Sequence, residues 1–254
     1  MLPLVQLISL LLAATATSGR PLQKRATLGF VAIGDSTTNN GTSTNSGGWI
    51  NGFCASLSGV PLAYCANEAH NGASTNSTIS SGQFATALNT IKSQVAAGRK
   101  VYATVQFGHN DQKIGDASAM GVNLQTMVDQ IRSAGGEPIL VTPLTRRTFS
   151  NGVISDSLGP FADETIRVAG VKSTKYIDLH TESIRYCNAI GETECHNLNK
   201  SSDDNTHLNA NGTTVFGRMV ALLIKAKASD VTLVTNTLLD CEITKGKPLN
   251  AACT

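Results

Sequence analysis

Ser36 lies at a position where a serine could act as a nucleophile. It closely follows the apolar run of residues 28–33, within the string GDSTTNN. Glycine, aspartate and serine are also common turn residues, so this string by itself favours a turn that closes a buried strand. A catalytic serine needs a general base, a group that orients the base and hydrogen-bond donors for the oxyanion. The choice between the two interpretations therefore depends on the rest of the chain.

The base for Ser36 would be one of five histidines, and His207 is the one with an acid in a tight local relation. Asp204 precedes it by three residues in DDNTH, and one turn of chain with this spacing places a carboxylate beside an imidazole. The alternative is a surface pair that caps the following helix, because D-x-x-H strings are common by chance. His109 is interpreted as a packed structural residue rather than a second base.

Strands alternating with helices are expected to position these residues. Apolar runs predict strands at 28–33, 60–66, 100–107, 137–143 and 175–179, and amphipathic stretches predict helices at 49–58, 81–97, 118–134, 157–170 and 213–227. This alternation predicts one α/β domain around a parallel sheet that is covered on both faces. Ligands of such sheets bind beyond the carboxyl ends of the strands, and the segments there are polar: GDSTTNNG, NEAHNGASTNS, GHNDQ and TPLTRRTF.

Four short blocks in a fixed order resemble those of the SGNH (GDSL-type) hydrolases. They are GDS near the start, the glycine of NEAHNGAS, GHND in mid-chain and the D-x-x-H string near the end. Longer strings look closest to the rhamnogalacturonan acetylesterases, a family of carbohydrate esterases. These strings are GDST followed by Asn-Gly, N-x-A-x-x-G-x-S over residues 67–74, FGHND, TPLTRRTF and DNTH. The resemblance covers residues 28–216, although Thr37 stands where the GDSL group has leucine.

The resemblance implies a flavodoxin-like three-layer α/β/α sandwich and a serine esterase. Carried over by position, Ser36 is the nucleophile, His207 is its base and Asp204 orients the base. The backbone N–H groups of Ser36 and Gly72 and the side-chain amide of Asn110 would form the oxyanion hole. Glycine permits close approach of the backbone, and an amide donates hydrogen bonds without being protonated. No metal or organic cofactor is required. A turn-forming role is the alternative for Asn110, and such a role for Gly72 would not exclude it from the oxyanion hole.

The expected substrate is an acetylated plant cell-wall polysaccharide, most specifically the rhamnogalacturonan region of pectin. Arg146 and Arg147 are candidate contacts to its carboxylates, because a guanidinium fork matches a carboxylate. An exposed charged loop is the equal alternative for this pair. Two alternative functions remain: an esterase or lipase for other acyl esters, such as acetylated xylan or lipids, and a non-enzymatic secreted sugar-binding protein. The polar loops favour a polar substrate, and the complete catalytic set favours an enzyme.

The first 25 residues predict export from the cell. Residues 1–19 are apolar and end in small residues, which is typical of a secretory signal, and residues 20–25 form a short pro-segment that ends at Lys24-Arg25. Residues 26–254 are then a single hydrolase domain. Without the leader, 17 basic residues face 18 acidic ones, so no nucleic-acid partner is expected. We expect no membrane partner, an extracellular location and a monomer.

All six cysteines follow this leader, and an even number is typical of disulfides in a secreted chain. Fifteen pairings can be drawn, and nearness in the sequence favours Cys54–Cys65, Cys187–Cys195 and Cys241–Cys253. A zinc site is the alternative, but the chain has no C-x-x-C pair. Four sequons would permit glycosylation, at Asn40, Asn76, Asn199 and Asn211.

Overall fold

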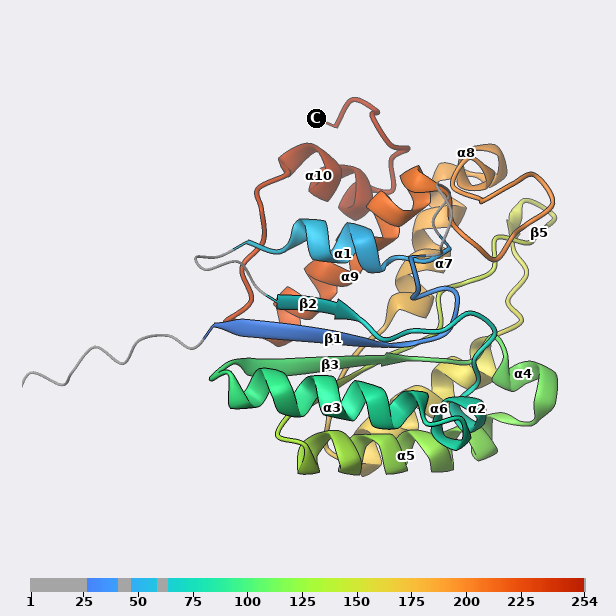
Figure 1. Cartoon of the computed structure of the whole chain (residues 1–254). Coiled ribbons are helices and arrows are strands. Elements are labelled where there is room, and N and C mark those ends of the chain that lie inside the picture. Colours follow the sequence, from blue (N-terminus) through green and yellow to red (C-terminus); the bar gives the residue numbers. More distant parts are fainter. Residues whose placement is uncertain (1–26, 41–46, 59–63, 254) are drawn as a thin grey trace, which may run out of the picture.

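The computed structural model describes residues 27–40, 47–58 and 64–253 (Figure 1). The signal segment, the pro-segment and the dibasic site that the sequence predicts lie outside the described residues. No helix in the described part is both long enough and apolar enough to cross a membrane.

Five parallel strands form the central sheet, in the order β2-β1-β3-β4-β7. Their bounds are β1 (Leu28–Gly34), β2 (Tyr64–Asn67), β3 (Lys100–Gln106), β4 (Glu137–Val141) and β7 (Lys175–Ile177). This order, 2-1-3-4-5 among the strands of the sheet, is that of the flavodoxin-like doubly wound fold. The predicted fold class is therefore confirmed. All five predicted strands exist, although the first part of the run 60–66 lies outside the described residues.

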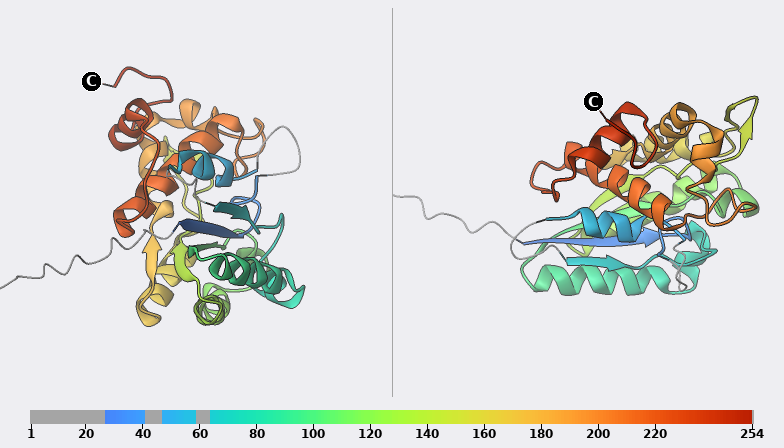
Figure 2. Two further views of the ribbon diagram at one scale, coloured as in Figure 1. Left: turned by 60° about the vertical axis from the view of Figure 1, so that its left-hand side comes forward. Right: turned by 90° about the horizontal axis from the view of Figure 1, so that it is seen from above.

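Helices cover both faces of this sheet (Figures 1 and 2). One layer is α3 (Gln83–Ala96), α5 (Ala117–Ser133) and α6 (Gly159–Val171), and the other is α1 (Ile50–Ser56), α7 (Leu179–Ile190) and α9 (Ala210–Lys227). Successive side chains of a strand point to opposite faces. Phe30 and Ala32 of β1 accordingly join one hydrophobic core, and Val31 and Ile33 join the other. This double burial explains why the strand sequences are continuously apolar.

The five predicted helices are present with ends within three residues of the expected ones, and further elements were missed. The missed elements are α2 (Thr75–Ser80), α4 (Asp111–Ile114), α7, α8 (Glu192–His196), α10 (Thr237–Lys245) and the hairpin of β5 (Phe149–Ser150) and β6 (Val153–Ile154). Helix α7 was hidden because the predicted strand 175–179 runs into it. The Asp178 carboxylate accepts a hydrogen bond from the N–H of Thr181, which ends the strand and starts the helix.

Three disulfides pair the cysteines as predicted. Cys54–Cys65 joins α1 to β2, Cys187–Cys195 joins α7 to α8, and Cys241–Cys253 joins α10 to the segment that follows it. Each closes a short loop of 8 to 12 residues, so each fixes local structure rather than tying distant parts of the fold together.

Candidate active site

The site lies at the carboxyl ends of β1 and β3, on the right-hand side of Figure 1. The chain goes from β1 to β2 on one side and from β3 to β4 on the other, so the strand order reverses between them. A crevice for a ligand is expected at such a switch point. A pocket of about 580 Å³ is present there. It is lined by Ser36, His109, Asn110, Lys113, Arg146, Thr148, Ser201 and residues 203–207.

Three side chains from distant parts of the chain form a hydrogen-bonded row in this pocket. Nε2 of His207 lies 2.8 Å from Oγ of Ser36, and Nδ1 of the same ring lies 2.8 Å from Oδ2 of Asp204. An ionised carboxylate can only accept hydrogen bonds, so Nδ1 carries the ring proton and Nε2 is free to accept from the serine hydroxyl. This is the arrangement of a nucleophile, a general base and an orienting acid.

The loop 199–208, between α8 and α9, holds the acid and the base together. Oδ1 of Asp204 accepts hydrogen bonds from the backbone N–H groups of Thr206 and His207, at 3.0 and 2.9 Å. Partial burial raises the pKa of the Asp204 carboxyl, but the hydrogen bonds from His207 and Thr206 outweigh this effect, and the pKa lies below its ordinary value. The carboxylate is therefore ionised at neutral pH, as an orienting acid must be.

The turn that carries Ser36 is braced by its neighbour Asp35. Oδ1 of Asp35 accepts hydrogen bonds from the N–H and the hydroxyl of Thr37, at 2.8 and 2.7 Å, and Oδ2 lies 3.7 Å from Nδ1 of His109. Burial raises the pKa of Asp35, yet its contacts with His109 and Thr37 outweigh burial and lower it. Burial lowers the pKa of His109, which is 2% exposed. His109 is thus a packed residue beside the nucleophile turn.

Gly34 ends β1 where a side chain has no room. A Cβ at this position would lie 2.5 Å from Oγ1 of Thr38 and 2.7 Å from the carbonyl oxygen of Gln106. That close approach lets the Thr38 hydroxyl donate to Oε1 of Gln106 at 2.6 Å, which ties the nucleophile turn to the end of β3. Gly34 is therefore required for the close packing of the turn that carries Ser36 against the end of β3.

The three donors expected for the oxyanion come from separate segments: Ser36 follows β1, Gly72 follows β2 and Asn110 precedes α4. Ser36 and Asn110 line the pocket, whereas Gly72 is not among its lining residues. Gly72 has φ +73°, a left-handed conformation that favours glycine. Within the described residues, the backbone N–H groups of Ser36 and Gly72 take part in no hydrogen bond. The amide nitrogen of Asn110 donates to the carbonyl of Ala73 at 3.0 Å, and its Oδ1 accepts from Nζ of Lys113 at 2.9 Å. Because an ammonium group only donates, Lys113 fixes which end of the amide faces it.

Lys113 is a residue that sequence reasoning missed. It lines the same pocket as Ser36 and orients Asn110, its neighbour one turn earlier on α4. The only signal in the sequence is that Lys113 follows Asn110 by three residues. This spacing places the two side chains side by side only because residues 111–114 form a helix.

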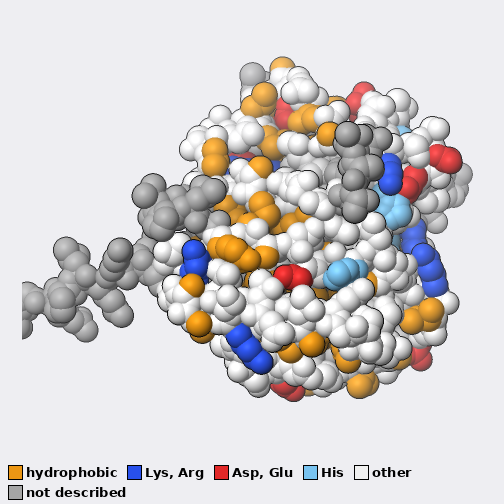
Figure 3. All heavy atoms as spheres, viewed as in Figure 1, with side chains coloured by type: hydrophobic (Ala, Val, Ile, Leu, Met, Phe, Trp, Pro, Cys, Tyr) orange, Lys and Arg blue, Asp and Glu red, His pale blue; other side chains and the backbone are white. Residues whose placement is uncertain are grey.

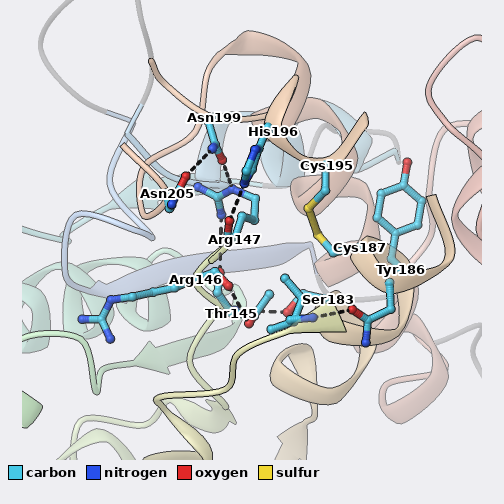
Figure 4. The surroundings of a disulfide bond; sticks show 12 residues. Thr145, Arg146, Arg147, Ser183, Tyr186, Cys187, Cys195, His196, Asn199 and Asn205 are labelled. Carbon is cyan, nitrogen blue, oxygen red and sulfur yellow. Dashed lines mark hydrogen bonds between the residues drawn. A yellow bond between two sulfur atoms is a disulfide. The ribbon is translucent and has the colours of Figure 1, made fainter. Parts of the chain in front are cut away.

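The two adjacent arginines have different environments. Arg146 is half-buried and lines the pocket, where its Nη1 donates to Oε1 of Gln112 at 2.6 Å and to Oγ of Ser157 at 2.9 Å. Arg147 is fully buried and points away from Arg146 (Figure 4). The prediction that Arg147 contacts substrate is therefore wrong, because the folded chain already encloses its guanidinium.

The sequons also differ in accessibility. Asn76 and Asn211 are exposed and Asn40 is half-buried, whereas Asn199 is 4% exposed. Nδ2 of Asn199, the atom that would carry a glycan, donates a hydrogen bond to Oδ1 of Asn205 at 2.9 Å. Oδ1 of Asn199 accepts a hydrogen bond from Nε of the buried Arg147. The sequence permits a glycan at Asn199, but in the folded chain this amide is buried and hydrogen-bonded, so Asn199 is not an accessible glycosylation site.

We expect the active protein, secreted from a eukaryotic host, to carry no glycan on Asn199. A glycan on Asn199 would displace its buried, hydrogen-bonded amide, so the loop 199–208 of a modified chain could not adopt the conformation seen here. Glycopeptide mass spectrometry of the purified active fraction tests this, with the exposed Asn76 sequon as the internal comparison. A substantially glycosylated Asn199 peptide from active protein would contradict it.

Comparison with known proteins agrees with this geometry. A model of the GDSL-like lipase/acylhydrolase family matches residues 32–215, and the chain belongs to that family of ester hydrolases. The rhamnogalacturonan acetylesterase RhgT of Bacillus subtilis (strain 168) is 31% identical over 171 residues, which cover 61% of this chain and 71% of RhgT.

Two solved structures show the same fold. Protein YXIM of Bacillus subtilis has a TM-score of 0.70 and 22% identity over 82% of this chain, and the chain spans 58% of the length of YXIM. Axe2, an acetylxylan esterase from Geobacillus stearothermophilus, has a TM-score of 0.54 and 12% identity, and the match covers 78% of this chain and 93% of Axe2. The protein is thus an esterase with the SGNH hydrolase fold.

Proposed function

We propose that the protein is a secreted serine acetylesterase that removes O-acetyl groups from plant cell-wall polysaccharide, with the rhamnogalacturonan region of pectin as substrate. The observation that carries the proposal is the row from Asp204 through His207 to Ser36 in an accessible pocket, with 2.8 Å at both contacts of the imidazole. The similarity to RhgT, which is named a rhamnogalacturonan acetylesterase, supports the choice of substrate.

The reaction begins when Oγ of Ser36 attacks the acetyl carbon while Nε2 of His207 takes the hydroxyl proton. The negative charge that develops on the carbonyl oxygen is stabilised by the N–H groups of Ser36 and Gly72 and by the amide of Asn110. The tetrahedral intermediate then breaks its bond to the sugar oxygen, which leaves as an alcohol with the proton from His207. Ser36 now carries the acetyl group.

Water completes the cycle. His207 takes a proton from a water molecule, whose oxygen attacks the acetyl carbon, and collapse of the second tetrahedral intermediate releases acetate and returns the proton to Ser36. Asp204 acts in both halves, because its carboxylate stabilises the imidazolium that forms each time.

The cations of the pocket support an acidic polymer as substrate, because the two carboxylates in its lining, Asp203 and Asp204, already accept hydrogen bonds from Ser201 and His207. Arg146 and Lys113 both line it, and neither forms an ion pair with an acidic side chain in the described part of the chain. Figure 3, which has the same view as Figure 1, shows basic, acidic and histidine side chains gathered on the right-hand side of the molecule. A uronate carboxylate next to the acetylated sugar would give these cations a partner, which a neutral xylan chain does not.

The disulfides support secretion. Three bridges in a chain of this size are typical of an oxidising compartment. They accompany the leader that the sequence predicts at residues 1–25, which lies outside the described residues.

The test of the proposed function is acetate release from acetylated rhamnogalacturonan and, in parallel, from acetylated xylan. We expect the wild-type protein to release acetate mainly from the pectic polymer and the Ser36→Ala variant to release almost none. Preferential release of acetate from xylan would contradict the proposed substrate and would still agree with an acetylesterase activity. Activity of the variant equal to that of the wild type would overturn the mechanism.

Arg146→Gln is expected to raise KM for acetylated rhamnogalacturonan about tenfold and to change kcat less than twofold. The loss of one charge-assisted hydrogen bond to a carboxylate corresponds to about that factor. The control is Arg167→Gln, an exposed arginine on α6 that is paired with Glu164 outside the pocket. Initial rates at low and high salt measure the effect. Equal KM values for the two variants would contradict a role of Arg146 in binding the polymer.

A further inference from the structure

Arg147 is a fully buried charge that the reaction described above does not use. Burying a cation is costly unless its donors are satisfied, and Arg147 has no ion pair with an acidic side chain in the described part of the chain. Its donors bond to oxygens instead: the carbonyl of His207 at 2.8 Å, the carbonyl of Thr145 at 3.4 Å and Oδ1 of Asn199. Burial lowers its pKa, an effect that the negative charge of Asp204 opposes.

These bonds converge on the loop that carries the general base. The backbone N–H of Arg147 donates to the carbonyl of Asn205 at 2.8 Å, and its guanidinium holds the carbonyl of His207 and the side chain of Asn199. The amide of Asn199 in turn donates to the side chain of Asn205 at 2.9 Å. One residue therefore contacts the loop at its start, near its middle and at the base itself.

The backbone of Arg147 is fixed by a contact with His196, as Figure 4 shows. Its carbonyl oxygen accepts a hydrogen bond from Nε2 of His196 at 2.8 Å. His196 lies on α8 directly after Cys195, and the disulfide to Cys187 fixes α8 to α7. The loop is thus connected through Arg147 to a covalently closed pair of helices.

We propose that Arg147 is a positioning residue for the esterase reaction, which holds the imidazole of His207 at hydrogen-bonding distance from Ser36. The inference rests on the proposed function. Asp204 binds the N–H side of His207, and Arg147 binds its carbonyl, so the backbone of the base is fixed on both sides. The backbone N–H of Lys200 also donates to this carbonyl, at 2.9 Å, but Lys200 belongs to the same loop, so Arg147 is the contact that fixes the carbonyl to a different part of the chain. Without it the loop and the ring can move relative to Oγ of Ser36, and a displacement of about 1 Å can cost about 10²-fold in rate.

The alternative is that Arg147 only stabilises the fold. Arg218 provides a matched comparison, because it is 3% exposed and its guanidinium makes two contacts with Asp240, at 2.6 and 2.8 Å, between α9 and α10. Replacing either arginine with lysine keeps the charge and removes the planar fork. Only one of the two contacts the loop of the general base.

The test compares Arg147→Lys with Arg218→Lys, using 4-nitrophenyl acetate as substrate. We expect Arg147→Lys to lower kcat about 10- to 100-fold with KM within twofold of wild type, because the side chain does not line the pocket. Arg218→Lys is expected to lower Tm and leave kcat per folded molecule unchanged. A fluorophosphonate that labels active serine nucleophiles counts the functional sites and gives the labelling rate of Ser36.

A second variant leaves Arg147 in place. His196→Ala removes the donor to its carbonyl and is expected to lower kcat severalfold, while His196→Gln, whose amide can donate, is expected to restore it. The proposal is overturned if Arg147→Lys labels and turns over like the wild type, or if it loses only Tm as Arg218→Lys does. A wild-type protein that is not labelled at Ser36 would instead contradict the proposed function.

Discussion

Ser36→Ala is expected to lower kcat by roughly 10³-fold or more on every ester that the protein hydrolyses, without a measurable change in Tm. The hydroxyl lies 2.8 Å from Nε2 of His207, and Ser36 is half-buried and lines the pocket, so the substitution deletes the proposed nucleophile and leaves the packing of the turn intact. The turn itself is held by Asp35 and Thr37, which the substitution does not touch.

Initial rates with 4-nitrophenyl acetate, together with thermal unfolding, measure this effect. Ser201→Ala is the control, since Ser201 lines the same pocket but its hydroxyl donates to Asp203, and we expect its kcat to stay within about twofold of wild type. A folded Ser36→Ala variant that keeps the turnover of the control would show that the nucleophile is another group.

His207→Ala is expected to be similarly severe, with a loss of about 10³-fold or more in kcat. Without the imidazole, Ser36 has no proton acceptor, and the departing sugar oxygen has no acid to protonate it. Asp204→Asn retains the imidazole but replaces the acceptor that selects its tautomer, so we expect a large loss for this variant as well.

The labelling rate of Ser36 by a fluorophosphonate separates these effects from unfolding. It should fall with kcat in His207→Ala, and circular dichroism should report an unchanged fold. His70→Ala provides the histidine control, because no contact of the His70 side chain to the catalytic row is present among the described residues. Normal labelling of a folded His207→Ala variant would exclude His207 as the base.

Much of the architecture is local information and could be predicted from the sequence. Each strand is a short run of apolar residues because both of its faces are buried, and each cysteine pairs with its nearest neighbour in the chain. Helix α7 was not predicted because the apolar run 175–179 contains both the strand β7 and the first residue of this helix. Asp178 belongs to the run 175–179 that predicts a strand, yet its carboxylate caps α7 by accepting a hydrogen bond from the N–H of Thr181.

Part of the hydrogen-bonded row of Asp204, His207 and Ser36 was also accessible from the sequence, for a related reason. Asp204 and His207 lie three residues apart, so their mutual contact is a property of one turn of chain. Ser36 was placed at a strand end, and the parallel sheet brings all such ends to one edge. The loop of Asp204 and His207 follows a helix rather than a strand, so this rule does not place it beside Ser36. The ordered blocks that resemble the SGNH hydrolases supplied the expectation that the three side chains meet.

The tertiary structure alone decided the roles of residues whose partners are distant in the chain. Arg146 and Arg147 are neighbours of the same type in an irregular segment after β4, where no helical or strand periodicity dictates direction. Arg147 is buried because its hydrogen bonds are completed by a loop 60 residues further along the chain, and Asn199 is inaccessible for the same reason. Residue types and local spacing therefore indicate which side chains can react, whereas long-range hydrogen bonds determine that Arg146 lines the pocket and that Arg147 is buried against the loop of His207.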